Sequence, residues 1–249
     1  MRLRILIPTF NEAENIKHLL TQLINLKIEG VEIDILVIDD GSPDGTAELA
    51  LSLRNQNVAV MERPFKTGLG PSYIAGITDT LQKNMYSHIM TMDADGSHQI
   101  VDLITLIDNA ILYPNFLILG SRWIPGGEIT NWPKWRQLIS RTGTWYAKKM
   151  LKLKIFDLTG GFKIYPVSFL EKIELDDIVS NGYSFQIELT MASVLNGAKY
   201  VEIPINFVER TNGRSKMSFK IFIEAIVQVT RWGFALRMRN NADKLHYVN

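Results

Sequence analysis

The sequence predicts an α/β protein in which a mostly parallel sheet is covered by helices on both faces. Three observations lead to this fold class. Strand and helix patterns alternate through the first two thirds of the chain. The strands contain few polar residues, which indicates burial of both strand faces, as in a parallel sheet. Polar residues also follow several strands directly, where open α/β sheets bind their ligands.

The chain opens with one strand and one amphipathic helix. Leu3–Ile7 is an uninterrupted apolar run, so we expect a short buried strand. Asn11 is a suitable N-cap for a helix over Glu12–Leu26, and two acids in the first turn favour a helix N-terminus there.

The same alternation continues to about residue 120. Ile33–Ile38 is the second apolar run, and the turn Gly41–Gly45 separates it from a helical segment over Ala47–Arg54. The next elements are a strand at Val58–Met61, a helix at Ser72–Leu81, a strand at Ile89–Met92, a helix at Leu103–Leu112 and a strand at Phe116–Leu119. No linker rich in Gly, Ser or Pro interrupts the chain, so we expect one domain over residues 1–249.

Composition limits the classes of function. The 27 basic and 26 acidic residues nearly balance, which argues against a nucleic-acid binder. The chain has no cysteine, so disulfides and thiolate metal sites are excluded. No secretory signal is visible, and no uncharged apolar run reaches the roughly 18 residues of a membrane span. We therefore expect a cytoplasmic protein that is soluble or lies on a membrane surface.

The most informative motif is the acidic pair Asp93 and Asp95, which follows the strand Ile89–Met92. Two carboxylates at a strand end repel each other and a phosphorylated ligand unless a divalent cation lies between them. Mg²⁺ or Mn²⁺ suits this position, because hard ions accept a few carboxylate oxygens and leave other positions for phosphate. An acidic turn that caps the next helix is the simpler alternative, and this motif alone does not decide between them.

Polar residues follow three strands, at Pro8–Glu12, Asp39–Gly41 and Asp93–Asp95. Right-handed crossovers bring such strand ends to one edge of a parallel sheet, so we expect the acids to share a cleft. No Walker-type phosphate loop is present, and Gly68–Gly70 does not follow the first strand, which disfavours an NAD-dependent oxidoreductase. Acids that bind a base or ribose, with a metal on the diphosphate, indicate a nucleotide-diphosphate donor.

Two segments after residue 120 have the pattern of helices that lie on a membrane. A basic helix with Trp and Tyr over about residues 132–154 suits an anionic headgroup region, although an ordinary solvated face is the alternative. The second segment, over about residues 217–238, has apolar residues interleaved with charged ones. We expect this helix either to lie on a membrane or to pack on the sheet. The positive residues of the first segment, with no acid among them, are Lys134, Arg136, Arg141, Lys148, Lys149, Lys152 and Lys154.

Several different short motifs follow one another along the chain between about residues 3 and 218. The main ones are Pro8–Glu12, Val37–Thr46 and Met92–Asp95. The others are Gly68–Gly70, Gly120–Arg122, Trp135–Arg136, Ser140–Arg141, Asp157–Phe162, Gly182–Gln186, Val208–Arg210 and Gly213–Lys216. Together they resemble the signature of family 2 glycosyltransferases with the GT-A fold, and within that family the dolichol-phosphate (polyprenol-phosphate) mannose synthases.

The resemblance implies a single catalytic GT-A domain that transfers mannose from GDP-mannose to a polyprenyl (dolichyl) monophosphate, with Mg²⁺ or Mn²⁺ as cofactor. It implies that guanosine is held by Pro8, Phe10, Glu12, Ile38 and Asp40. It implies that ribose, diphosphate and metal are met by Asp93, Ala94 and Asp95. Some members place a metal-binding Gln two residues after the second Asp, where this chain has the shorter Ser97.

For the acceptor, the resemblance implies that its phosphate is received by Arg122, Arg136 and Ser140. Arg210 and Lys216 match a flexible loop that closes over the donor. Asp95, Arg122 and Arg136 are the candidate catalytic residues.

The charges of the reactants explain this choice of residues. A polyprenyl monophosphate is anionic near neutral pH, because its second pKa is about 6, so it needs no dedicated general base. A metal stabilises the leaving diphosphate and arginines hold the attacking phosphate. Single displacement inverts the anomeric centre and gives a β-linked mannosyl phospholipid. We expect Asp39 to support its turn, and Asp157 to be structural unless the acceptor is a sugar hydroxyl.

Two other hypotheses remain. One is a polyprenyl-phosphate glucosyltransferase that uses UDP-glucose, and the other is a non-catalytic nucleotide-sugar or membrane adaptor, which need not retain the acids and arginines. Some family members carry their own membrane helices and others depend on small membrane partner subunits. We therefore expect this chain to need such a subunit, or to dock peripherally through its basic helix on the cytoplasmic face of a membrane.

Overall fold

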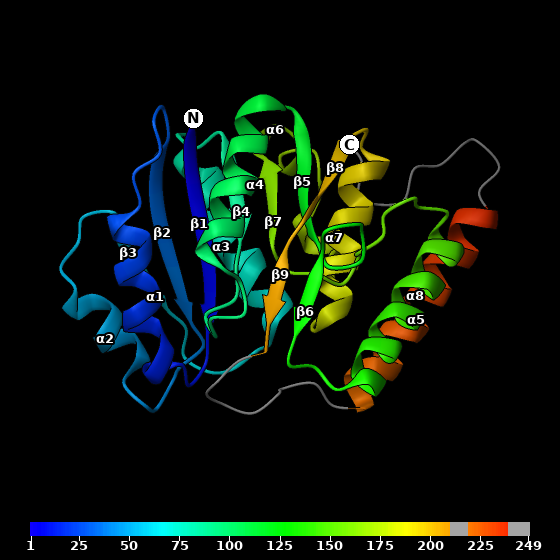
Figure 1. The fold of residues 1–249 in the computed structure, drawn as a ribbon, viewed down its shortest axis with the longest axis horizontal. Helices are drawn as coiled ribbons and strands as arrows, with labels where there is room; N and C mark the ends of the chain where they lie inside the picture. Colours follow the sequence, from blue (N-terminus) through cyan, green and yellow to red (C-terminus); the bar gives the residue numbers. More distant parts are fainter. Residues whose placement is uncertain (210–218, 239–249) are drawn as a thin grey trace.

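The computed structural model describes residues 1–209 and 219–238 (Figure 1). Its centre is a seven-stranded sheet in the order β3-β2-β1-β4-β7-β5-β8. Within the described part of the chain, β7 is the strand that runs antiparallel to its neighbours, so the predicted mostly parallel sheet is confirmed. The strands of this sheet are β1 (Arg2–Thr9), β2 (Glu32–Asp39), β3 (Val58–Glu62), β4 (His88–Thr91), β5 (Phe116–Ser121), β7 (Lys163–Pro166) and β8 (Lys199–Pro204). A small second sheet pairs β6 (Glu128–Thr130) with β9 (Asn206–Val208) in parallel.

Helices cover both faces of the sheet, as predicted. The main helices are α1 (Ala13–Asn25), α2 (Thr46–Ser52), α3 (Leu69–Lys83), α4 (Ile100–Leu112), α5 (Lys134–Leu151), α7 (Tyr183–Leu195) and α8 (Phe219–Met238). Two short turns complete them, α6 (Val167–Leu170) and the 3₁₀ helix Leu175–Asp177. Alternate residues of β1 divide between two cores: Ile5 and Ile7 pack with α1, α2 and α4, whereas Leu6 packs with α3, α5, α7 and α8.

The first helix does not use the predicted N-cap. Asn11 has a positive φ of 55°, and α1 begins at Ala13. The first free N–H groups are satisfied from the neighbouring turn instead: Glu12 N–H donates to the hydroxyl of Thr46 at 3.0 Å, and Ala13 N–H donates to Asp44 Oδ2 at 3.1 Å. The side chains of Asp44 and Thr46, from another turn, thus cap the N-terminus of α1 in place of Asn11.

Helix α3 begins three residues before the predicted Ser72. Its first turn contains Gly70 and Pro71, which read as turn residues in the sequence. A proline is tolerated there because first-turn N–H groups have no partner within the helix. Gly70 is required by close packing, since a Cβ on it would lie 2.0 Å from the carbonyl oxygen of Ser180.

Helices α5 and α8 lie side by side at the end of the molecule opposite β3 (Figure 1). The hydroxyls of Tyr146 and Thr230 are 2.6 Å apart, and Arg237 Nη1 donates to the carbonyl of Met150 at 3.0 Å. The sequence pattern left open whether this segment lies on a membrane or packs on the sheet. In the structure the main contacts of α8 are with α5 and α7. None of the helices among the described residues combines the length and apolarity that crossing a bilayer requires.

Candidate active site

Three strands that are neighbours in the sheet build one edge of the candidate site. β2, β1 and β4 lie in this order and run in parallel. Their carboxyl ends therefore meet at the same edge, where they carry Phe10, Asp39–Asp40 and Asp93–Asp95. The predicted convergence of these strand ends is confirmed.

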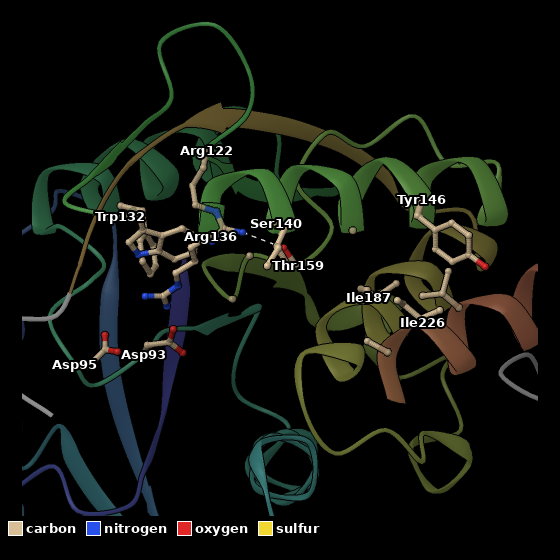
Figure 2. A pocket seen from close by; sticks show the side chains of 17 residues that line it. Asp93, Asp95, Arg122, Trp132, Arg136, Ser140, Tyr146, Thr159, Ile187 and Ile226 are labelled. Atoms are coloured by element: carbon tan, nitrogen blue, oxygen red, sulfur yellow. Dashed lines mark hydrogen bonds between the residues drawn. The ribbon is translucent and has the colours of Figure 1, made fainter. Parts of the chain in front are cut away.

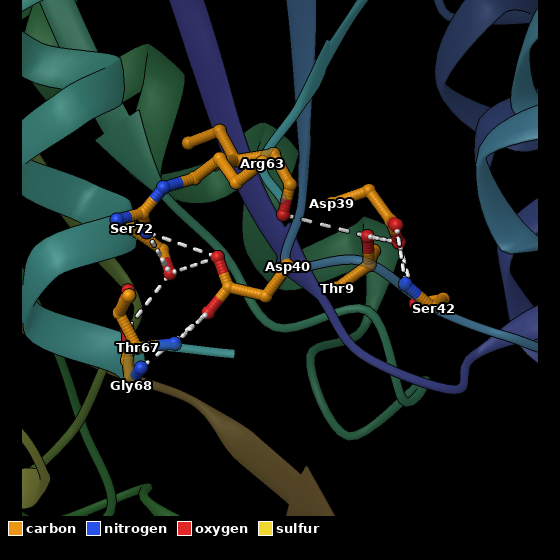
Figure 3. Close-up of polar contacts among 9 residues, drawn as sticks. Thr9, Asp39, Asp40, Ser42, Arg63, Thr67, Gly68 and Ser72 are labelled. Carbon is orange, nitrogen blue, oxygen red and sulfur yellow. Dashed lines mark hydrogen bonds and ion pairs between the residues drawn. The ribbon is translucent and has the colours of Figure 1, made fainter. Parts of the chain in front are cut away.

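Asp39 holds the turn that follows β2. Its Oδ1 accepts hydrogen bonds from the hydroxyls of Thr9 at 2.8 Å and Ser42 at 2.6 Å. Its Oδ2 accepts a third from the main-chain N–H of Ser42 at 2.8 Å (Figure 3). With both oxygens engaged in a buried position, Asp39 has the supporting role expected from the sequence.

Asp40 organises the loop that leads into α3. Its Oδ1 accepts from Arg63 Nη1 and from the hydroxyl of Ser72, both at 2.9 Å (Figure 3). Its Oδ2 accepts from the main-chain N–H groups of Thr67 at 3.3 Å and Gly68 at 3.4 Å. Sequence reasoning missed Arg63 and Ser72, although Arg63 directly follows β3, the next strand along the same edge.

The other residues expected to hold guanosine differ in exposure. Phe10 is half-buried, and the Lys66 ammonium lies over its ring at 4.1 Å from the centroid. Pro8 is half-buried and Glu12 is buried. The Ile38 side chain lies entirely in the core, so its main chain is what remains for contact with a ligand.

The acidic pair lies on the loop after β4. Asp93 is half-buried, and Ala94 and Asp95 are buried. The main-chain N–H of Ser97 donates to Asp95 Oδ1 at 3.1 Å, which fixes the second carboxylate. The Ser97 side chain is 1% exposed, and metal ligation by its hydroxyl stays a prediction.

A histidine that the sequence interpretation missed supports this loop. His98 Nδ1 accepts a hydrogen bond from the main-chain N–H of Asp93 at 3.2 Å. The His98 ring stacks on Phe162 with centroids 4.3 Å apart. Burial lowers the pKa of His98 to about 4, so the imidazole is neutral near pH 7 and its Nδ1 is able to accept. His98 therefore positions the backbone of the acidic pair.

Asp93 and Asp95 line the same cavity and supply the oxygen ligands that Mg²⁺ and Mn²⁺ prefer. In the part of the chain that the structure describes, no group of three or more His, Cys, Asp or Glu side chains is arranged to hold a metal. The residues thus fit an ion held through two carboxylates, with its other positions open to substrate phosphate and water.

Arg122, after β5, is held by a buried carboxylate. Its Nε donates to Asp157 Oδ2 at 2.6 Å and its Nη2 to Asp157 Oδ1 at 2.8 Å. Nη2 also donates to the Thr159 hydroxyl at 3.0 Å. Burial tends to raise the pKa of Asp157, but the charge and hydrogen bonds of Arg122 outweigh it, and the pKa is lowered. Asp157 thus anchors Arg122, in agreement with its predicted structural role.

Lys163 is a second buried charge that sequence reasoning did not assign. Its Nζ donates to the carbonyls of Leu158 and Gln186, each at 3.1 Å, and to the Thr190 hydroxyl at 2.8 Å. Burial lowers the pKa of Lys163 to about 7, against the opposing effect of the Asp157 carboxylate. The lysine ties the start of β7 to the first turns of α7.

Arg136 and Ser140 lie one turn apart on α5, and both line the cavity, as their spacing suggested. The Arg136 guanidinium forms an ion pair with Glu209 and lies 4.0 Å from the ring centroid of Trp132. Arg141 lies instead over Trp123, at 4.7 Å from that centroid. Arg136 therefore lines the cavity, whereas Arg141 lies outside it against Trp123.

The cavity that these residues surround has a volume of about 120 Å³. Figure 2 shows Asp93, Asp95, Arg122 and Arg136 at one end and Tyr146, Ile187 and Ile226 at the other. Apolar side chains from α5, α7 and α8 make the second end. The site thus joins a charged compartment to an apolar slot, which suits a ligand with an anionic head and a hydrocarbon chain. The predicted loop residues Arg210 and Lys216 lie outside the described residues.

Comparison with known sequences finds glycosyltransferases, both by family profile and by individual relatives. The Glycosyl transferase family 2 profile matches residues 4–174. An undecaprenyl-phosphate mannosyltransferase of Micrococcus luteus is 44% identical over 239 residues, which cover 95% of this chain and 96% of the relative. A polyprenol monophosphomannose synthase of Mycolicibacterium smegmatis is 43% identical over 241 residues, covering 95% and 89%.

Solved structures share the fold at low identity. Mannosyl-3-phosphoglycerate synthase from Rubrobacter xylanophilus has a TM-score of 0.70 at 15% identity, covering 98% of this chain and 77% of the other. Glucosyl-3-phosphoglycerate synthase from Mycobacterium tuberculosis, in complex with Mn²⁺, UDP-glucose and phosphoglyceric acid, has a TM-score of 0.66 at 14% identity, covering 97% and 81%. The predicted GT-A fold is confirmed, and the chain belongs to glycosyl transferase family 2.

Proposed function

We propose that this glycosyltransferase transfers mannose from GDP-mannose to a polyprenyl (dolichyl) monophosphate and forms a β-linked mannosyl phospholipid. The observation that carries the proposal is the two-part cavity, in which an acidic pair and two arginines adjoin an apolar slot. A nucleotide sugar needs the first part, and a lipid phosphate needs both. The names of the two relatives described above, at 44% and 43% identity, support the same lipid acceptor and sugar.

The donor would lie along the edge formed by β1, β2 and β4. Asp40 fixes the loop beside the proposed guanosine position through Arg63 and Ser72. Asp93 and Asp95 would hold Mg²⁺ or Mn²⁺, which when bound supplies positive charge to the leaving diphosphate. The remaining predicted contacts, among them Ser97, Arg210 and Lys216, belong to the same proposal.

The acceptor phosphate would be received by Arg122, Arg136 and Ser140. Arg122 is already held in a fixed orientation by Asp157, so it presents its charge without reorganisation. Arg136 is paired with Glu209, and this ion pair would have to open for the guanidinium to receive the phosphate. The isoprenoid chain would then extend between α5, α7 and α8, past Ile187 and Ile226.

The chemistry proposed is a single displacement at the anomeric carbon. The acceptor phosphate is already anionic, so its oxygen attacks without losing a proton to the protein. Asp157, the one acid considered as a base, has both oxygens bonded to Arg122. Inversion converts the α-linked donor to a β-linked product.

We further propose that a single catalytic domain, residues 1–249, docks on the cytoplasmic face of a membrane through α5 and α8, with or without a small membrane partner subunit. Trp135, Leu138 and Trp145 are 62–63% exposed at helical spacing along α5. On α8, Val227, Phe234 and Met238 are 48%, 56% and 81% exposed. Exposed apolar and basic side chains on paired helices suit an anionic lipid surface.

The direct test is transfer of labelled sugar to a polyprenyl phosphate in detergent. GDP-mannose and UDP-glucose are offered in parallel, each with Mg²⁺, with Mn²⁺ or with EDTA. Metal-dependent lipid product from GDP-mannose alone is the expected result. Product from UDP-glucose alone would keep the fold and reaction class but overturn the donor. If neither donor gives lipid product, with a partner subunit or without it, the proposed acceptor is wrong.

A further inference from the structure

A buried amide on α7 has no hydrogen-bond partner in the described part of the chain. Gln186 is 1% exposed, and neither its Oε1 nor its Nε2 has a partner among the described residues. Its backbone, in contrast, is firmly held, because its carbonyl accepts from Lys163 Nζ at 3.1 Å and from the Thr190 hydroxyl at 2.7 Å. An unpaired buried amide destabilises a folded protein, so one that is held in place indicates a group that arrives with a ligand.

The amide borders a notch at Gly161, a glycine that lines the cavity together with Asp93. A Cβ added to Gly161 would lie 3.4 Å from Gln186 Nε2 and 3.5 Å from Asp93 Oδ1. The missing side chain therefore leaves room for an atom of methyl size between an amide N–H and a carboxylate oxygen.

The two walls of this notch select a particular group. A hydroxyl accepts a hydrogen bond from the amide and donates one to the carboxylate, so it satisfies both. Without a cation between them, a phosphate oxygen in the notch would be repelled by the Asp93 carboxylate, and a methyl group would leave the Gln186 amide without a partner. The chemistry of the notch is therefore that of an alcohol oxygen.

We propose that the notch binds one hydroxyl of the hexose on the nucleotide-sugar donor, which makes Gln186 a specificity-determining residue. The inference rests on the proposed function, which places the diphosphate at Asp93 and Asp95. The transferred hexose is the next group along the donor, so it lies beside Gly161. Gln186 then distinguishes hexoses by the position and configuration of that hydroxyl.

The test compares binding of GDP with binding of GDP-mannose by calorimetry, both with Mn²⁺, in two variants. Gln186→Met keeps the shape but removes the amide, and Gly161→Ala fills the notch. Alanine at 161 meets its neighbours at ordinary contact distances, and this glycine does not have a positive φ. We expect each variant to lose about 10-fold to 100-fold in affinity for GDP-mannose, with GDP unchanged.

Three controls make the result specific. Ser193→Ala removes a buried hydroxyl farther along α7 that bonds only Leu189 among the described residues, and it should change neither affinity. Gln186→Met should leave the melting temperature of the free protein equal or higher, because it removes an unpaired amide. A deoxy-mannose donor without the bound hydroxyl should bind wild type and Gly161→Ala equally well.

Several results would overturn the inference. They are unchanged GDP-mannose affinity in both variants, equal loss of GDP and GDP-mannose, and a lower melting temperature with loss of both ligands. Failure of the proposed donor is seen separately, in wild type, as weak GDP-mannose binding beside tight UDP-glucose binding. The same variants are then measured with UDP and UDP-glucose, and the same outcomes apply.

Discussion

The half of the site built on β1, β2 and β4 and the half built on β5, α5 and α8 hold their charged side chains in different ways. In the first half, Asp39 and Asp40 are held mainly by hydroxyls and main-chain N–H groups of nearby loops. In the second half, Arg122 and Arg136 are paired with carboxylates that are distant in sequence. Aromatic rings also surround these arginines, Trp132 among them.

This difference explains how one site could bind the two anionic substrates that we propose. The first half is polar and fixed by its own loops, which suits a nucleotide with many hydrogen-bonding groups. The second half combines arginine side chains with an apolar slot and is assembled over long sequence separations, which suits a lipid phosphate. Substitutions that affect one half and spare the other test this division.

The largest effect is expected at the junction of the two halves. Asp95→Asn keeps an oxygen that accepts from the Ser97 N–H, so the loop and the melting temperature should be retained. It removes a negative ligand from the proposed metal position, and we expect transfer to fall by about 10³-fold. Radiolabel transfer and the melting temperature are measured together. A variant that transfers mannose as fast as wild type would contradict the assignment of Asp95.

Arg136→Ala should damage only the acceptor half. Loss of a charged hydrogen bond to phosphate is expected to lower kcat/KM for the lipid phosphate by about 10-fold to 100-fold, with unchanged GDP binding. Arg141→Ala is the matched control on the same helix, because Arg141 stacks on Trp123 and does not line the cavity. Equal losses in the two variants would contradict the division.

A smaller effect is expected outside the cavity, on the membrane. Replacing the exposed Lys149 and Lys152 by Gln should weaken binding to anionic vesicles by roughly 30-fold, at about 1 kcal/mol per lysine. Lys148 is left intact because its Nζ lies 3.6 Å from the ring centroid of Phe156. Lys17→Gln with Lys27→Gln changes two exposed lysines on and just after α1 as the control. Unchanged co-sedimentation of the first pair would reject docking through α5.

The smallest effect on activity, but a defined one on stability, is expected at Lys163. Its pKa is about 7 in the folded protein and near 10.5 when unfolded. Between these values the unfolded chain binds a proton that the native chain lacks, so the free energy of unfolding rises with pH from 7 to 10. Below pH 7 both states are protonated and this contribution is constant. Lys163→Met should flatten the rise measured by urea unfolding, and an unchanged slope would show that Lys163 keeps its proton.

The first half of the fold and site was largely predictable from the sequence. Apolar runs mark β1, β2 and β4, and the acids at their ends must meet once the strands are adjacent and parallel. Local signals failed where a partner came from elsewhere. Asn11 looked like the cap of α1, yet Asp44 and Thr46 satisfy the free N–H groups from another turn.

The second half resisted prediction because its structure depends on distant partners. The sequence does not show that Asp157 belongs to Arg122, or that Lys163 within the short strand β7 donates to Thr190. Strand β7 itself is four residues long and lies between two strands that precede it in the chain. Such pairings depend on tertiary contacts, which periodicity does not encode.

The order of the elements along the chain also determines when the site can form. Thr91 on β4 pairs with Lys163 on β7, which closes a long loop and brings Gly161 beside Asp93. Non-local pairings of this kind form late in folding, because the loop entropy is lost before the contacts are gained. During synthesis, a nascent chain that ends before β7 already carries every acid of the donor half but has no reaction cavity. Residues of α7 and α8, which follow β7 in the chain, also line the cavity. The complete cavity is thus a property of the nearly complete polypeptide.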